Sequence, residues 1–386
     1  MSPNPSDLRN VLVAVSGQTP AIITETLWAL ERQFATRVDE IRIITTSRGR
    51  DIISNRLLGA NGEFSRFCAD YEIPPGRIAF SEKSVYVLND SRGSSLEDIR
   101  TREDNANAAD QVYNLINEWC KRKDESLLCS VAGGRKTLGI YLAMSLMMCG
   151  RKDDKLYHVL VSPSFETGVP AFFYPPPRER LYSRSNPLGT AHVPDQISSK
   201  EARVELAEVP FIRLRDVTER RNLVPKGYLE AVKATQLVMH YLQSPPELRI
   251  SLETCAVKIG RFEFTLSKQR AAVYSFFLLH FNGIGAGASI ETLFDNRMIL
   301  ADLERRIDKF GIGEKEVYSW QKLRDLEEFK RQMGPCITKV NKDIRRNLAN
   351  DLLASRYLIS LGGSYGVNVK RFKVLGANSQ AWKGLQ

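Results

Sequence analysis

The strongest constraint on the fold is an apolar run that ends abruptly at a glycine-containing loop, and this pattern occurs twice. Residues 11–15 are continuously apolar and are followed by the loop 16–20, which contains Gly17. Residues 126–131 are mostly apolar and are followed by the loop 132–137, in which two glycines are adjacent. Such runs are typical of strands that are buried on both faces of a parallel sheet. Each loop leads into a helical pattern, so we expect two β-loop-α units.

Strands and helices continue to alternate through most of the chain. Further strands are expected at residues 41–45, 157–161 and 209–214, and helices at 20–30, 48–54, 103–122, 137–149 and 228–242. Alternation of this kind implies right-handed crossovers and a sheet with helices on both faces. The expected fold class is therefore α/β, with a Rossmann-like, doubly wound and mostly parallel sheet.

The pattern changes at residues 243–246, where a glutamine, a serine and two prolines favour a turn. A chain of 386 residues suits two domains, each large enough to bury its own core. We therefore expect one domain at residues 1–244 and a second at residues 245–386.

Positive charge is concentrated at the end of the chain. The whole chain has a net charge of +10, and residues 330–386 alone contain eleven Lys and Arg against two Asp, a local net charge of +9. A concentrated basic surface is the expected footprint of a polyanion-binding domain, and a solvated helix face is the alternative.

The same region has the element order of a winged helix-turn-helix domain. Residues 336–348 place apolar side chains on one helical face and basic or amide side chains on the other. Two expected strands, 357–361 and 367–372, follow with a glycine turn between them, and residues 283–334 are an insertion in this pattern. The interpretation predicts binding of double-stranded DNA by seven residues: Lys339, Asn341, Lys342, Arg345 and Arg346 on the helix, and Lys370 and Arg371 on the wing.

Several classes of protein are disfavoured. The sequence has no apolar stretch long enough to span a membrane and no signal-peptide pattern at its start, so we expect a cytoplasmic protein without a membrane partner. The six cysteines form no C-x-x-C pair and several stand in apolar runs, which predicts buried thiols. The four histidines are not spaced for metal ligation. We therefore expect no metal and no cofactor.

Each glycine loop precedes a helix, and helix N-termini attract anions through free N–H groups and a partial positive charge. The loops are not the familiar nucleotide motifs. Arg135 stands where a Walker loop needs glycine, and Gly17 stands alone where a dinucleotide fingerprint needs three glycines. The alternative is structural: the glycine pair makes only a tight turn, Thr19 only caps a helix, and Lys136 is solvated.

The motifs together resemble a known family. Residues 13–26, 132–137 and 158–166, together with 209–215, are similar to the CRISPR-associated Rossmann-fold (CARF) proteins, specifically the branch linked to ring nucleases. The resemblance implies a homodimer that binds cyclic tetra-adenylate across its two-fold axis and cleaves it without a metal. The ligand is then opened to linear di-adenylate with a 2′,3′-cyclic phosphate by attack of a ribose 2′-hydroxyl.

The resemblance also implies roles for individual residues. Lys136 would stabilise the developing charge, and Ser16 or Thr19 would contact the reacting ribose or phosphate. The ring would be positioned by Gly17, Gln18, Gly133, Gly134, Arg135 and Thr137. Two further carboxylates, Glu25 and Glu166, could face this site, but solvated side chains are the expected reading.

Two other functions stay open at this stage. A transcription regulator would sense the ligand without cleaving it, and a structural adaptor would use the basic domain to recognise protein or RNA. A messenger-activated ribonuclease of the commonest kind is disfavoured, because no histidine follows His280 to pair with an arginine.

Overall fold

The computed structural model describes residues 8–59, 61–166, 169–184, 196–218, 225–309, 320, 323–348 and 350–376. These residues form two compact units. The first takes the described residues of Met1–Arg215 and Pro225–Val232, and the second takes those of Asp216–Val224 and Lys233–Gln386. The division falls inside helix α8 (Tyr228–Gln243), and the expected boundary at residue 244 lies just beyond the end of the same helix.

The first unit is built on a six-stranded sheet with the strand order β3-β2-β1-β4-β5-β8. The strands are β1 (Arg9–Val15), β2 (Glu40–Thr45), β3 (Val85–Val87), β4 (Glu125–Ser130), β5 (Lys155–Val161) and β8 (Val204–Glu208). The first five pair in parallel, and only β8 is antiparallel to its neighbour β5 among these described strands. The prediction of a mostly parallel, Rossmann-like α/β sheet is confirmed.

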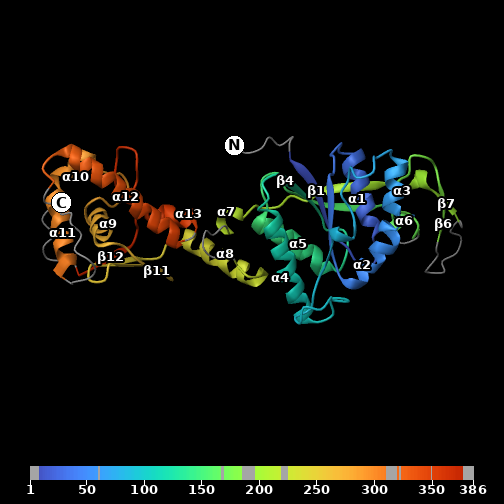
Figure 1. Cartoon of the computed structure of the whole chain (residues 1–386), viewed down its shortest axis with the longest axis horizontal. Helices are drawn as coiled ribbons and strands as arrows, with labels where there is room; N and C mark the ends of the chain where they lie inside the picture. The colour runs from blue at the N-terminus through green and yellow to red at the C-terminus, as the bar shows by residue number, and fades with distance from the viewer. Residues whose placement is uncertain are drawn as a thin grey trace. The chain divides into compact units, whose positions relative to one another are not determined.

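Helices cover both faces of this sheet (Figure 1). Along β1, Leu12 and Ala14 are buried against one set of helices, and Val13 and Val15 against the other. The first set includes α1 (Ala21–Arg32) and α3 (Glu63–Asp70), and the second includes α4 (Arg102–Trp119) and α5 (Lys136–Cys149). The two cores explain why β1 is apolar at every inner position.

Shorter elements connect these layers. Helix α2 (Ser47–Ile53) continues as a π-helix (Ser54–Leu58), and the others are η3 (Glu82–Ser84), α6 (Pro163–Glu166), β6 (Leu181–Ser183), β7 (Gln196–Ser198), η4 (Ser199–Glu201) and α7 (Arg215–Thr218). Strands β6 and β7 pair with each other as an antiparallel ribbon.

The prediction of a strand at residues 209–214 is wrong, because the last strand of the sheet, β8, ends at Glu208. Val209 still donates to the carbonyl of Leu156, at 2.8 Å, but Pro210 has no N–H with which to continue. Beyond it, side chains replace the ladder. Arg213 donates to three backbone carbonyls, those of Arg151 (2.8 Å), Lys152 (3.2 Å) and Asp154 (2.8 Å).

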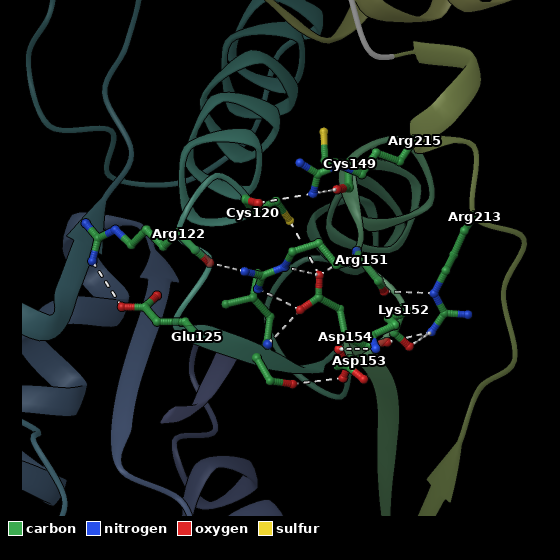
Figure 2. A network of polar contacts seen from close by, with 12 residues as sticks. Cys120, Arg122, Glu125, Cys149, Arg151, Lys152, Asp153, Asp154, Arg213 and Arg215 are labelled. Atoms are coloured by element: carbon green, nitrogen blue, oxygen red, sulfur yellow. Dashed lines mark hydrogen bonds and ion pairs between the residues drawn. The ribbon is translucent and has the colours of Figure 1, made fainter. Parts of the chain in front are cut away.

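Arg215 completes this attachment, which we call the arginine clamp (Arg213 and Arg215). Its guanidinium donates to the carbonyls of Cys120 and Cys149 at 3.1 and 3.3 Å (Figure 2). Between the two arginines, the N–H of Leu214 donates to the carbonyl of Met147 at 2.8 Å. The segment that leaves the sheet is therefore fastened to the C-terminal end of α5.

The buried carboxylate of Asp154 fixes the loop 151–154, whose carbonyls accept hydrogen bonds from Arg213. Asp154 is fully buried, and it accepts hydrogen bonds from the N–H of Leu127 (2.8 Å) and from the backbone and side chain of Arg151 (2.7–3.0 Å). Figure 2 shows its carboxylate beside the thiol of Cys120, at 3.8 Å. A buried charge is tolerated when it is paired and hydrogen-bonded, as here.

The second unit has its own sheet and core. The strand order is β11-β10-β9-β12, from β9 (Leu248–Ser251), β10 (Ala256–Ile259), β11 (Phe262–Thr265) and β12 (Phe372–Leu375). Its helices are α9 (Lys268–His280), α10 (Ile290–Asp295), α11 (Arg297–Lys309), α12 (Leu326–Leu348), α13 (Asp351–Ala354) and the 3₁₀ helix η6 (Ser355–Tyr357).

The basic helix exists but begins ten residues earlier than expected, and the hairpin after it differs. Residues 358–361 are not a strand, and residues 365 and 367 make isolated bridges to Ala288 and Asn282. The chain then forms β12, which runs parallel to β9. The winged helix-turn-helix interpretation stays a prediction.

Five of the six cysteines are buried as expected, and Cys68 is half-buried. No helix in the described part of the chain combines the length and apolar character needed to cross a membrane.

Candidate functional site

The two glycine loops meet at the carboxyl ends of two adjacent strands. Strands β1 and β4 pair in parallel, with Ala14 opposite Ser130, so the loops that follow them leave the sheet side by side. The chain continues from β1 to β2 on one side, while β4 lies on the other. This is a topological switch point, where open α/β sheets bind ligands.

A pocket of about 330 Å³ lies between these loops, and we call it the loop pocket. Seven residues expected at the ligand site line it: Ser16, Gly17, Gln18, Thr19, Gly133, Gly134 and Arg135. The volume is within the range of small-molecule sites.

Close approach of the backbones requires glycine here. A β-carbon on Gly17 would lie 3.1 Å from the Cα of Gly134. Gly134 itself has φ +74°, a left-handed conformation that glycine adopts without steric cost. A β-carbon on Gly133 would lie 2.7 Å from the carbonyl oxygen of Val15. The glycines therefore let the loop after β4 pack directly on the loop after β1.

Ser16 is one of the residues that line the loop pocket, and its hydroxyl is buried. The residue is 1% exposed, and its Oγ has no hydrogen-bond partner among the described residues. Its backbone is fixed, since its N–H donates to Ile44 (3.1 Å) and its carbonyl accepts from the hydroxyl of Thr45 (2.7 Å). Buried polar atoms are nearly always paired, so an unpaired hydroxyl on a pocket-lining residue makes Ser16 a candidate for contact with a ligand.

The charges that line the loop pocket are balanced. Arg135 donates two hydrogen bonds to the carboxylate of Asp98, one from Nε at 2.9 Å. The hydrogen bond from Arg135 lowers the pKa of Asp98 to about 2. Arg48 and Glu97 also line the pocket, which therefore has two cations and two carboxylates. A phosphate ligand would have to compete with Asp98 for the Arg135 guanidinium.

Lys136 and Thr137 do not line the loop pocket. Lys136 is the first residue of α5, exposed and without a hydrogen-bond or ion-pair partner among the described residues. Helix α1 begins at Ala21 with Pro20 as its cap, and no side chain caps it. The structural alternative, in which Thr19 only caps this helix, is therefore wrong, and the hydroxyl of Thr19 is not used as a cap.

The expectation of a solvated Glu25 is also wrong. Glu25 is 6% exposed, because the segment around Phe173 covers α1, as the 2.8 Å hydrogen bond from Thr24 to the carbonyl of Phe173 shows. Burial, and then the negative charge of Glu166, raise the pKa of Glu25 to about 8. Glu25 does not line the loop pocket, and Glu166 is exposed.

Sequence reasoning missed part of the pocket wall: Thr46, Arg48, Gly49, Glu97, Asp98 and Leu138. The first three follow β2, the neighbour of β1, so the rule that ligands bind at carboxyl ends of strands could have found them. Asp98 stands in a loop with no strand or helix pattern, and no signal in the sequence pointed to it.

The residues expected to bind DNA separate into three groups. Asn341 is buried, and its amide exchanges hydrogen bonds with the backbone of Ile359 at 2.8 and 2.9 Å, so it is not available to a base edge. Lys339, Lys342 and Arg346 are exposed and spaced along one face of α12. Arg345, Lys370 and Arg371 line a different pocket of the second unit.

Helix α5 has an apolar surface that the described residues leave uncovered. Ile140 is 53% exposed and Met144 is 43% exposed, although the helix is apolar on nearly every side. A helix of this kind is usually buried all round.

The fold and the pocket define the first unit as an open α/β domain with a candidate ligand site at its switch point. The family model described as CRISPR-associated protein NE0113 matches residues 19–240, more than half of the chain, and the chain belongs to this family. The comparison with curated proteins finds no relative of this chain.

Among solved structures, the chain is similar to Enterococcus italicus Csm6 bound to cyclic hexa-2′-fluoro-hexa-dAMP, with 10% identity and a TM-score of 0.26. The similarity covers 88% of this chain and 56% of that one, so this chain spans little more than half the length of the Csm6 chain.

Proposed function

We propose that the first unit binds a cyclic oligoadenylate, cyclic tetra-adenylate in particular, in the loop pocket and cleaves it. The observation that carries the proposal is the meeting of two glycine loops around the orphan hydroxyl of Ser16. Membership of a CRISPR-associated family and the resemblance of these motifs to ring-nuclease CARF proteins support the same ligand.

The pocket suits part of such a ring. Its volume of about 330 Å³ is too small to enclose four nucleotides, so one chain would hold only a portion of the ligand. A second copy of the chain, related by a two-fold axis, would present the same cradle to the other half. The exposed apolar face of α5, with Ile140 and Met144, is a suitable surface for such a homodimer.

The proposed reaction uses the ligand's own nucleophile. A ribose 2′-oxygen attacks the neighbouring 3′-phosphorus, the bond from phosphorus to the 5′-oxygen breaks, and the proton lost by the 2′-hydroxyl is balanced by one gained at the 5′-oxygen. The product end is a 2′,3′-cyclic phosphate, and two such cuts give linear di-adenylate. The protein must align the 2′-oxygen with the leaving group and stabilise charge on the phosphate oxygens.

Residues of this chain can supply both needs. Ser16 and Thr19 offer hydroxyls at the pocket wall, and the glycines at 133 and 134 let backbone N–H groups approach the phosphate. Lys136 stands on the first turn of α5, where it would add positive charge beside the phosphate once the ligand is bound.

The test is incubation of the full chain with radiolabelled cyclic tetra-adenylate and a chelator, followed by separation of the products. Linear di-adenylate with a cyclic phosphate end is expected from the wild type, and much slower release from Lys136→Ala and Ser16→Ala. Lys83→Ala is the matched control, since Lys83 is an exposed lysine of the same unit that lies outside the loop pocket. A ring that stays intact in the wild type contradicts cleavage.

One observation favours a second candidate, a sensor that binds the ring without cutting it. Lys136 does not line the loop pocket. Arg135, the residue before it, does line the pocket, but its guanidinium is hydrogen-bonded to Asp98. In that case we expect tight binding of the ring without formation of product, and the second unit would carry out the response to the bound ligand.

For the second unit we propose binding of double-stranded DNA by the exposed face of α12. Lys339 and Lys342 stand one turn apart there, and Arg346 follows one turn later. Lys339→Ala/Lys342→Ala is expected to weaken a salt-sensitive mobility shift of duplex DNA. No shift with the wild type would instead favour a structural adaptor.

A further inference from the structure

A second pocket lies within the second unit and has a different character. It has a volume of about 820 Å³, and its lining includes four cations, Arg345, Arg356, Lys370 and Arg371, and no carboxylate among the described residues. We call it the cationic pocket. Four like charges repel one another, so such a cluster is unfavourable unless an anion compensates it.

The walls of the cationic pocket are held rigidly by hydrogen bonds. The amide of Asn341 exchanges hydrogen bonds with the backbone of Ile359 and so fixes it. At the next residue, the hydroxyl of Ser360 donates to the carbonyl of Ser364 (2.8 Å) and accepts from the N–H of Gly366 (2.9 Å). A pocket whose walls are already ordered spends little entropy when a ligand enters.

A close backbone approach joins two further walls. A β-carbon on Gly366 would lie 3.0 Å from the Cα of Gly287, so glycine is needed at this contact. The neighbouring residues Tyr365 and Ala288 exchange backbone hydrogen bonds at 2.8 and 2.9 Å. The loop 283–287 and the segment 364–371 are therefore fixed to each other around the pocket.

Hydrogen bonds orient the three guanidinium groups of the pocket but use only some of their N–H donors. Arg371 donates to the carbonyl of Pro245 at 2.8 Å, and Arg356 donates to the carbonyl of Leu242 at 3.3 Å. Arg345 reaches the carboxylate of Asp351 at 3.3 Å. Each guanidinium has several N–H donors, so most stay available. Lys370 has no hydrogen-bond or ion-pair partner among the described residues.

Guanidinium groups match phosphate oxygens in shape as well as charge. The pocket is concave and in the size range of small-molecule sites, whereas a DNA duplex is convex and bulky. The occupant that fits is therefore a compact anion with more than one negative charge and some apolar surface to contact the exposed side chains of Ile284 and Leu361.

We propose that the cationic pocket binds a nucleotide-sized ligand with two or more phosphate charges. This site is separate from the loop pocket and from the exposed face of α12, and it does not depend on either proposal above. The chemistry has two sources, a free nucleotide or the phosphorylated end of a nucleic-acid strand, and both present the same phosphate group.

The test is calorimetric titration of the full chain with ADP and with a 5′-phosphorylated oligothymidylate. The variant is Arg356→Ala/Lys370→Ala, and the matched control is Lys258→Ala/Arg261→Ala, which removes the same charge from residues of the same unit outside the pocket. The pocket variant is expected to weaken binding about tenfold or more, and the control less than about twofold. Lys370→Glu alone should act in the same direction, and it breaks no described contact.

Tighter binding of ADP identifies a free nucleotide, and tighter binding of the oligonucleotide identifies a strand end. The proposal is overturned if the wild type binds neither probe, if the control loses as much affinity as the pocket variant, or if Arg135→Ala rather than the pocket variant abolishes ADP binding. Duplex binding and ring cleavage are read separately, so loss of those activities in the wild type leaves this result interpretable.

Discussion

The loop pocket and the cationic pocket are both suited to phosphates, but they handle charge in opposite ways. The loop pocket pairs Arg135 with Asp98 and carries as many carboxylates as cations among its lining residues. The cationic pocket carries four cations and no carboxylate among its described lining residues. The first pocket must therefore select its ligand by shape and by fixed hydrogen-bond donors, while the second can attract any compact anion.

The largest effect is expected where shape matters most. Gly134→Ala places a β-carbon at φ +74°, which costs about 1–2 kcal/mol, and the contact with Leu138 at 3.3 Å adds to it. Because the loop would have to move, binding of cyclic tetra-adenylate should fall about a hundredfold. Equilibrium binding of labelled ligand measures this.

Gly93→Ala is the matched control, because Gly93 has φ +82° and open space around it. An equal loss of affinity in the two variants would mean that general destabilisation, not pocket shape, explains the result.

The next effect concerns the free energy of unfolding rather than ligand affinity, and it is expected in the first unit, which contains Glu25. The pKa of Glu25 is raised to about 8, so the folded state keeps a proton that the unfolded chain releases above its ordinary pKa. Stability from this group is present at low pH and is lost as the pH rises toward 8. If the two proteins are matched at pH 5, Glu25→Gln should exceed the wild type by roughly 3 kcal/mol at pH 8.

Urea unfolding of the first unit at both pH values measures this, and Glu205→Gln, an exposed carboxylate of the same unit, is the control. An unchanged pH dependence in Glu25→Gln would show that Glu25 is ionised in the folded protein.

A smaller effect is expected from the ion pair itself. Asp98→Asn frees the Arg135 guanidinium for the ligand, so affinity for cyclic tetra-adenylate should rise about threefold to fivefold. Asp51→Asn is the control, since Asp51 pairs with Arg50 outside the loop pocket. Weaker binding by Asp98→Asn would mean that Asp98 positions Arg135 and does not compete for it.

The smallest expected effect is a difference in how steeply ligand affinity falls with salt concentration at the two pockets. Between about 50 and 200 mM salt, cyclic tetra-adenylate affinity should fall less than about threefold, whereas ADP affinity for the cationic pocket should fall about tenfold. Titrations at several salt concentrations measure both slopes. Equal slopes would remove the contrast between the two pockets.

Much of the loop pocket could be predicted from the sequence, because parallel strands deliver their following loops to one edge of the sheet. That rule needs only the strands before Gly17 and Gly133. It could not supply Asp98, whose carboxylate reaches Arg135 from a loop far away in the sequence. Ion pairs between distant loops depend on tertiary packing, which local patterns do not encode.

The errors have a similar origin. Glu25 has the spacing of a solvated helix residue, but a later segment covers it, so its burial depends on contacts distant in sequence. Residues 209–214 have the composition of a strand, yet no neighbouring strand continues the ladder past Pro210. In the second unit, the amide of Asn341 looked exposed on a helical wheel but is used to fix Ile359.

The two ends of helix α5 make different contacts: one end lies at the loop pocket, and the other end is bound by the arginine clamp. Near its N-terminal end, Leu138 lines the loop pocket, and at its last residue the carbonyl of Cys149 accepts a hydrogen bond from Arg215. The whole helix has fourteen residues and is about 20 Å long. Because every acceptor named for the clamp is a main-chain carbonyl, replacing the side chains of the residues that carry these carbonyls leaves the acceptors in place, and a substitution at Arg213 or Arg215 is what removes the donors.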